Sequence, residues 1–142
     1  MGNKIDVKTR IKTLEDTILS STGLILGTNI HVLDVPIGHD NYIHTINCGD
    51  DNKEVLVLVH GYASCGIIFF RILKELSEKY KVYSIDILGM GMSSRPRFDC
   101  TTAEETIDFF NKGIEKWRNA LGLDQYFSRS FSRGSSSLSL RS

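Results

Sequence analysis

The sequence predicts an α/β fold in which a mostly parallel sheet is flanked by helices. Residues 55–59 are apolar at every position, which indicates a strand that is covered on both faces. Residues 68–80 place apolar side chains on one face of a helix, and residues 82–87 return as a second buried strand. Because the connections are short, these segments form a right-handed crossover unit with two parallel strands.

Residues 1–27 form a leader with an amphipathic helical pattern. Its apolar residues recur at spacings of four, three and four, at Val7, Ile11, Leu14 and Ile18. One interpretation is a helix that packs on the domain through this stripe or frays in solvent. The other is an interfacial helix on anionic lipid, since the segment is also basic. The basic residues are Lys4, Lys8, Arg10 and Lys12.

Residues 28–127 form a partial domain with further elements around the crossover unit. Residues 29–35 and 42–47 are rich in strand-forming residues and predict an antiparallel pair, the first closed by Pro36. A third helix begins near residues 101–104, whose Thr-Thr-Ala-Glu has capping-box spacing, and ends at Gly122. Its apolar stripe consists of Ile107, Phe110, Ile114, Trp117 and Leu121.

The composition argues against several classes of protein. The 142 residues include 17 basic and 17 acidic side chains, so no net charge draws the chain to nucleic acid. Three separated cysteines without Cys-x-x-Cys spacing argue against disulfides and a metal site. Gly89-Met90-Gly91 lacks the third glycine of a dinucleotide loop. With no signal-peptide core and no membrane-length apolar run, we expect a cytoplasmic protein without a cofactor.

Two short motifs follow the buried strands, and they carry a resemblance. His60-Gly61-Tyr62-Ala63 follows the first strand, and Asp86-Ile87-Leu88-Gly89-Met90-Gly91-Met92-Ser93 follows the second. Over residues 40–127 this order resembles the α/β-hydrolase superfamily, up to the position of its nucleophile elbow. Residues 93–98 and 115–118 resemble the subfamily of lysophospholipases and lysophosphatidic acid acyltransferases that includes the adipose triglyceride lipase co-activator. The resemblance implies the N-terminal half of an α/β-hydrolase fold, truncated before the elbow.

The resemblance also implies roles for the loop residues. Gly61, Tyr62 and Ala63 would form the oxyanion-hole loop, in which a backbone N–H stabilises the charge of the transition state. His60 would support this loop. The remaining structural motif, braced by a carboxylate, would comprise Asp86, Gly89, Gly91 and Ser93.

Other roles for these residues are weaker interpretations. A catalytic base at His60 does not fit the triad order of the family, which runs Ser, acid, His. Asp86, near the carboxyl end of a buried strand, could act as an acid or a base. Cys65 could be a nucleophile, but it has no obvious base beside it, so a buried or idle thiol is favoured. We therefore predict no catalytic residue in this chain.

Residues 128–142 are rich in Ser and Arg, which predicts a disordered tail. Ser130-Phe131-Ser132-Arg133-Gly134 is one glycine short of the elbow motif Gly-x-Ser-x-Gly. Codons can be chosen for residues 127–134 so that a shift of one nucleotide encodes Ser-Leu-Gly-His-Ser-Leu-Gly, and a frameshifted C-terminus is therefore one hypothesis. Truncation at this point would leave the strand at residues 55–59 as an open edge prone to aggregation.

Three functions are compatible with this sequence. The resemblance implies that an intact relative hydrolyses or transfers the acyl group of a lipid ester or lysophospholipid through a serine nucleophile. This chain would be inactive as written, since it lacks a recognisable nucleophile, acid and catalytic His. The first alternative is a non-catalytic lipase regulator at a membrane or lipid droplet, in contact with a protein partner. The second is an interaction protein that uses the Ser/Arg tail.

Overall fold

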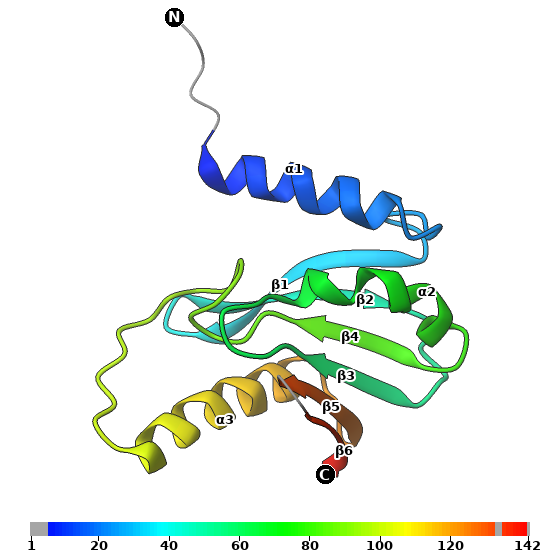
Figure 1. Cartoon of the computed structure of the whole chain (residues 1–142). Coiled ribbons are helices and arrows are strands. Elements are labelled where there is room, and N and C mark those ends of the chain that lie inside the picture. Colours follow the sequence, from blue (N-terminus) through cyan, green and yellow to red (C-terminus); the bar gives the residue numbers. More distant parts are fainter. Residues whose placement is uncertain (1–5, 133–134, 142) are drawn as a thin grey trace, which may run out of the picture.

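A computed structural model describes residues 6–132 and 135–141, with side chains up to residue 128. The helices are α1 (Val7–Ser20), α2 (Phe70–Ser77) and α3 (Ala103–Ala120), and the short 3-10 helix η1 (Gly66–Phe69) precedes α2. The strands are β1 (Ile30–Gly38), β2 (Asn41–Cys48), β3 (Val55–Val59), β4 (Lys81–Ile85), β5 (Tyr126–Ser132) and β6 (Ser135–Arg141). Helices α1 and α2 lie on one face of the sheet, and α3 lies on the other (Figure 1).

The strands form one sheet in the order β1-β2-β4-β3-β5-β6. β3 pairs in parallel with β4, as the crossover unit requires, and also with β5. β1 and β2 form the predicted antiparallel pair, and β2 adds antiparallel to the free edge of β4. β5 and β6 are antiparallel as well. The sheet is therefore mixed rather than mostly parallel, because the crossover accounts only for its centre.

Two apolar clusters fill the space between the sheet and its helices. On the face of α1 and α2, Leu19 and Leu73 pack against Leu58 and other buried residues of the sheet. On the face of α3, Trp117 packs with Val57 and Ile85. The side chains of β3 alternate between these clusters, so both faces of the strand are covered, as its continuous apolar sequence predicts.

The apolar stripe of α1 is not the face that packs on the sheet. Val7, Ile11 and Leu14 are exposed, whereas Glu15 and Leu19 are buried. Ile18, the fourth residue of the stripe, is half-buried. The helix packs on the domain as expected, but through Leu19 and the contact of Glu15 with His44 rather than through most of its stripe. In the part of the chain that the structure describes, no helix is long and apolar enough to cross a membrane.

Helix α3 begins one residue later than its sequence motif suggests. Thr102 is the N-cap, and its hydroxyl accepts from the backbone N–H of Glu105, whose carboxylate accepts in return from the N–H of Thr102. Two apolar residues of the predicted stripe differ in their burial. Trp117 is fully buried, but Ile107 is 60% exposed, because the N-terminal turns of α3 extend beyond the sheet, as Figure 1 shows.

The expected disordered tail is instead a pair of strands in the structure. β5 pairs with β3 from Leu56↔Phe127 to Val59↔Ser130, and β6 pairs with β5. The unpaired backbone groups of β3 provide the physical reason, since an open edge binds any segment that can extend along it. β3 is therefore not an open edge here. The elbow-like segment at residues 130–134 includes Arg133 and Gly134, which lie outside the described residues.

Candidate functional site

Two loops meet beyond the carboxyl ends of β3 and β4. The first runs from His60 to Cys65 and leads into η1, and the second runs from Asp86 to Ser94. Because β3 and β4 are parallel neighbours, their following loops lie at the same end of the sheet. This is the end at which open α/β sheets bind their ligands.

The Asp86 carboxylate joins the two loops. It is 3% exposed, and its Oδ1 accepts from the backbone N–H of Gly66, which is 2.5 Å away. Its Oδ2 accepts from the N–H of Met92 at 2.7 Å. Each carboxylate oxygen thus binds a backbone donor from a different segment, so Asp86 is engaged as a brace and is not presented to a ligand.

Gly91 and Ser93 fit closely around Asp86. A Cβ on Gly91, whose φ is +52°, would overlap the Asp86 carboxylate. The hydroxyl of buried Ser93 donates to the backbone oxygen of Asp86 at 2.6 Å and accepts from the N–H of His44 in β2 at 2.8 Å. Gly89 also has a positive φ, of +84°, but no atom lies within 4 Å of its Cβ position.

His60 lies beneath the first loop and is 3% exposed. Its Nε2 accepts from the backbone N–H of Ile87 at 3.0 Å, and its Nδ1 lies 2.8 Å from the carbonyl oxygen of Gly61. These contacts require a neutral imidazole with its proton on Nδ1. The ring ties the two loops together and has no nitrogen free to act as a base.

The oxyanion-loop candidates lie at the surface of this end of the molecule. The side chain of Tyr62 is 92% exposed, and Ala63 has a φ of +54°, in the left-handed region that a residue with a Cβ rarely adopts. Cys65 ends the loop. Burial raises the pKa of its thiol, and the charge of Asp86 raises it further, so the thiol keeps its proton at neutral pH.

An apolar cavity of about 490 Å³ opens beside these loops. The aromatic rings of Phe98, Phe109 and Phe110 form one wall, with ring centroids 5.2 to 6.2 Å apart. Tyr62 of the first loop and Arg95 of the second also line it. The cavity therefore places an aromatic surface next to the candidate oxyanion loop. No sequence pattern indicated this cavity, and Phe110 was expected only as part of the apolar stripe of the third helix.

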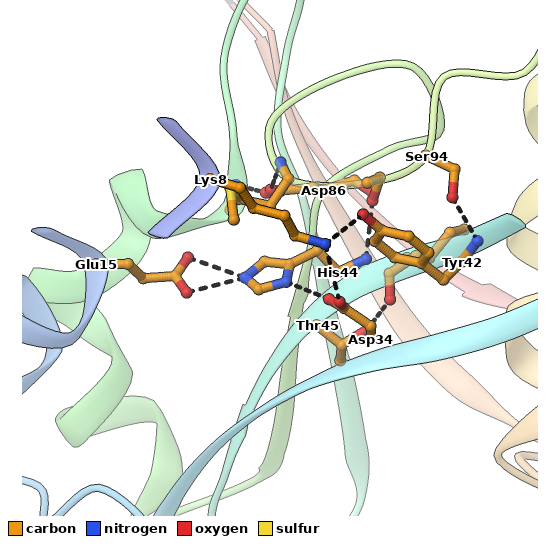
Figure 2. A network of polar contacts seen from close by, with 12 residues as sticks. Lys8, Glu15, Asp34, Tyr42, His44, Thr45, Asp86 and Ser94 are labelled. Atoms are coloured by element: carbon orange, nitrogen blue, oxygen red, sulfur yellow. Dashed lines mark hydrogen bonds and ion pairs between the residues drawn. The ribbon is translucent and has the colours of Figure 1, made fainter. Parts of the chain in front are cut away.

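A buried charge cluster under α1 was also missed. Figure 2 shows the imidazole of His44 between the carboxylates of Glu15 and Asp34. Glu15 lies 29 residues from His44 in the sequence, and no short motif indicates such a pair. The sequence shows only a glutamate that follows Leu14 of the apolar stripe, and its burial is evident from the structure alone.

The sheet order, the two loops and their bracing aspartate define an α/β-hydrolase fold. The model of the α/β-hydrolase fold family matches residues 54–136, and the chain belongs to this family. The curated relatives include a probable 1-acylglycerol-3-phosphate O-acyltransferase of Oryza sativa, which is 40% identical over 86 residues, 60% of this chain and 21% of that protein. The pig 1-acylglycerol-3-phosphate O-acyltransferase ABHD5 is 43% identical over 93 residues, 64% of this chain and 26% of that protein.

The chain therefore spans about a fifth to a quarter of the length of these curated relatives. Among solved structures, the carboxylesterase CesB of Bacillus subtilis superposes with a TM-score of 0.70 at 20% identity. That alignment covers 92% of this chain and 42% of the esterase. At this identity the likeness shows the fold alone.

Proposed function

We propose that this chain binds the acyl chain of a lipid ester in the apolar cavity beside the Gly61–Ala63 loop. The observation that carries the proposal is the wall of Phe98, Phe109 and Phe110, which offers a continuous apolar surface to a flexible hydrocarbon. The relatives named as 1-acylglycerol-3-phosphate acyltransferases support a lipid as the ligand. An oxyanion loop next to this wall fits the chemistry of acyl transfer.

Arg95 supplies a candidate partner for an anionic headgroup at the same cavity. Its guanidinium donates to the backbone oxygens of Gly91, at 2.9 Å, and Ser93, at 3.3 Å, and these contacts fix its position at the rim. A guanidinium has five N–H donors in a planar fork that suits phosphate. We infer that Arg95 favours a phosphorylated lysolipid over a neutral one.

The test is a binding titration of the whole chain with lysophosphatidic acid, monoacylglycerol and a fluorescent fatty acid. Phe98→Ser is expected to weaken binding of all three by about tenfold through lost apolar contact. Ile107→Ser is the matched control, because Ile107 is similarly exposed but does not line the cavity. Arg95→Gln should weaken the binding of the two anionic ligands, lysophosphatidic acid most, and leave the binding of the neutral monoacylglycerol unchanged. No binding by the unaltered chain, or equal effects of the Phe98 and Ile107 substitutions, would contradict the proposal.

We further propose binding without turnover for this chain. Both ring nitrogens of His60 contact backbone groups, and both of His44 contact carboxylates, so neither buried imidazole can take a proton from a nucleophile. The same titration samples should therefore release no fatty acid from lysophosphatidic acid or monoacylglycerol above the uncatalysed background. Release of fatty acid that Phe98→Ser abolishes would contradict this proposal.

The exposed stripe of α1 favours a second function, contact with a membrane surface. Val7 and Leu14 are 68% and 63% exposed, and Arg10 lies on the same helix. An exposed apolar stripe with cationic residues nearby suits the boundary between headgroups and acyl chains in an anionic bilayer.

Sedimentation with vesicles of phosphatidylcholine and phosphatidylserine tests this contact. Leu14→Asp is expected to reduce the bound fraction by about tenfold, since it removes an apolar side chain and adds a negative charge. Thr13→Asp adds the same charge at the neighbouring exposed position and should have a smaller effect. An equal reduction of the bound fraction in both variants would mean that the negative charge alone weakens binding and that the apolar stripe does not contribute. If the unaltered chain does not sediment with the vesicles, the contact is excluded.

A further inference from the structure

The charge cluster under α1 joins three elements through one imidazole. His44 projects from β2 and is 5% exposed, and Glu15 projects from α1 and is 6% exposed. His44 Nε2 lies 2.9 Å from Glu15 Oε1, and His44 Nδ1 lies 2.6 Å from Asp34 Oδ1 in β1. The residues point toward one another across the gap between the helix and the sheet (Figure 2).

The geometry requires a charged imidazole. Ionised carboxylates only accept hydrogen bonds, so both ring nitrogens of His44 must carry protons in order to donate to Glu15 and Asp34 at the same time. Burial disfavours the charged ring, but the hydrogen bonds that the ring donates to Glu15 and Asp34 outweigh this effect and raise the pKa of His44 to about 9.

Other charged and titratable groups face the same cluster. Lys8 of α1 lies 3.9 Å from Asp34 Oδ2 and donates to the hydroxyl of Tyr42 at 2.9 Å. Asp86, after β4, adds a negative charge that also favours the protonated ring. Cys65 lies near enough to Asp86 and Glu15 to respond to both charges, and its thiol is neutral. The cluster thus pairs its carboxylates with the cations of His44 and Lys8.

Few other contacts attach α1 to the sheet. Among the residues of α1, only Glu15 and Leu19 are buried; Val7, Ile11 and Leu14 of its apolar stripe face solvent, and Ile18 is half-buried. A helix of 14 residues that buries one apolar side chain gains little from the hydrophobic effect. Its attachment therefore depends strongly on the contact between Glu15 and His44.

The backbone of His44 holds the second site loop. Its N–H donates to the hydroxyl of Ser93 at 2.8 Å, and its carbonyl oxygen accepts from the N–H of Asp86 at 2.9 Å. Two residues earlier, Tyr42 exchanges hydrogen bonds with Ser94, through its N–H and its carbonyl oxygen. The strand segment that binds α1 with its side chain therefore binds the cavity-lining loop with its backbone.

We propose that Glu15, His44 and Asp34 form a charge clamp that docks α1 on the sheet and couples its docking to the loop at residues 86–94. When the clamp opens, α1 leaves the sheet and the loop loses support from β2. Whether α1 is docked or released thus controls how well ordered the loop at residues 86–94 is, and this loop lines the apolar cavity.

The clamp has a defined pH dependence. The pKa of His44 is raised in the folded protein, so its contribution to docking is complete below the ordinary value of about 6.5 and is lost as the pH rises through about 9. Alkaline solution should therefore release α1 while the rest of the fold remains.

Hydrogen exchange of the whole chain, followed residue by residue by NMR, tests the proposal. Exchange rates are divided by the intrinsic rate at each pH. Between pH of about 7 and about 10, the protection of the α1 amides in the unaltered chain should fall by at least about tenfold, and that of the Asp86 and Ser94 amides should fall with it. The amides of β3 and the near-ultraviolet signal of Trp117 report that the core is intact.

Glu15→Gln provides the matched variant, since it preserves shape and removes the charge. It should abolish the protection of α1 already at neutral pH and remove its pH dependence. Asp16→Asn makes the same change of charge at the next position of α1, outside the cluster, and should behave like the unaltered chain. Equal protection of α1 in these two variants would overturn the clamp. Release of α1 without any change at Asp86 and Ser94 would overturn the coupling.

Discussion

Asp86→Asn is expected to lower the free energy of unfolding by about 3 kcal/mol, as two buried charge-assisted hydrogen bonds are weakened or lost. The two carboxylate oxygens accept from Gly66 and Met92, and both partners are backbone donors. An asparagine has one oxygen and one NH₂ group. Either orientation of the amide therefore sets a donor against a donor and leaves one buried N–H without an acceptor. Urea denaturation followed by the fluorescence of Trp117 measures the difference.

Asp99→Asn is the control for the loss of a negative charge. Asp99 pairs with Arg97 at 2.7 Å, but its side chain is 65% exposed, so solvent screens the pair and the substitution should leave the unfolding midpoint almost unchanged. Equal midpoints for the two variants would show that the Gly66 and Met92 amides find other acceptors, and that Asp86 is not the brace between the loops.

The core elements were predictable because their sequence pattern is local. The continuous apolar run of β3 indicated a central strand, and the structure covers both of its faces. The antiparallel pair of β1 and β2 is confirmed, although β1 extends through Pro36 to Gly38. Proline is tolerated there because β1 is an edge strand, where its missing N–H needs no partner.

The orientation of α1 and the state of the C-terminal residues were not predictable in this way. The stripe of α1 indicated which face is apolar, but the pairing of Glu15 with His44 depends on two segments that only the fold brings together. The serine-rich composition of residues 128–142 indicates only the intrinsic preference of this segment for disorder. Their pairing with β3 depends on the backbone groups of another strand, which composition does not report.

The residues of the candidate site were predictable only in part. The sequence predicted roles for His60, Asp86 and Ser93 through a family resemblance, and the structure places all three among the loops beyond β3 and β4. The aromatic wall of the cavity was not predicted, because Phe98 precedes α3 while Phe109 and Phe110 lie within it. A helical stripe alone cannot distinguish a residue that packs in the core from one that lines a cavity.

Gly91→Ala is expected to destabilise the protein more than Gly89→Ala, although both residues have a positive φ. An alanine in this conformation costs about 1 kcal/mol at either position. At Gly89 the Cβ position is open, so this cost is the whole effect. At Gly91 the new methyl group would overlap the Asp86 carboxylate, and the loop must move away from the amides that it binds.

The comparison of these two alanine variants isolates the close approach at Asp86 from backbone strain. Gly91→Ala should lose about 3 kcal/mol in urea denaturation, while Gly89→Ala loses about 1 kcal/mol. The exchange of the Met92 amide should also accelerate in the first variant and not in the second, since this amide donates to Asp86. Equal losses, with an unchanged Met92 amide, would mean that the loop shifts freely around Asp86. In that case the carboxylate would not fix the spacing between the two loops, and the contacts of His60 with Gly61 and Ile87 would have to hold them together.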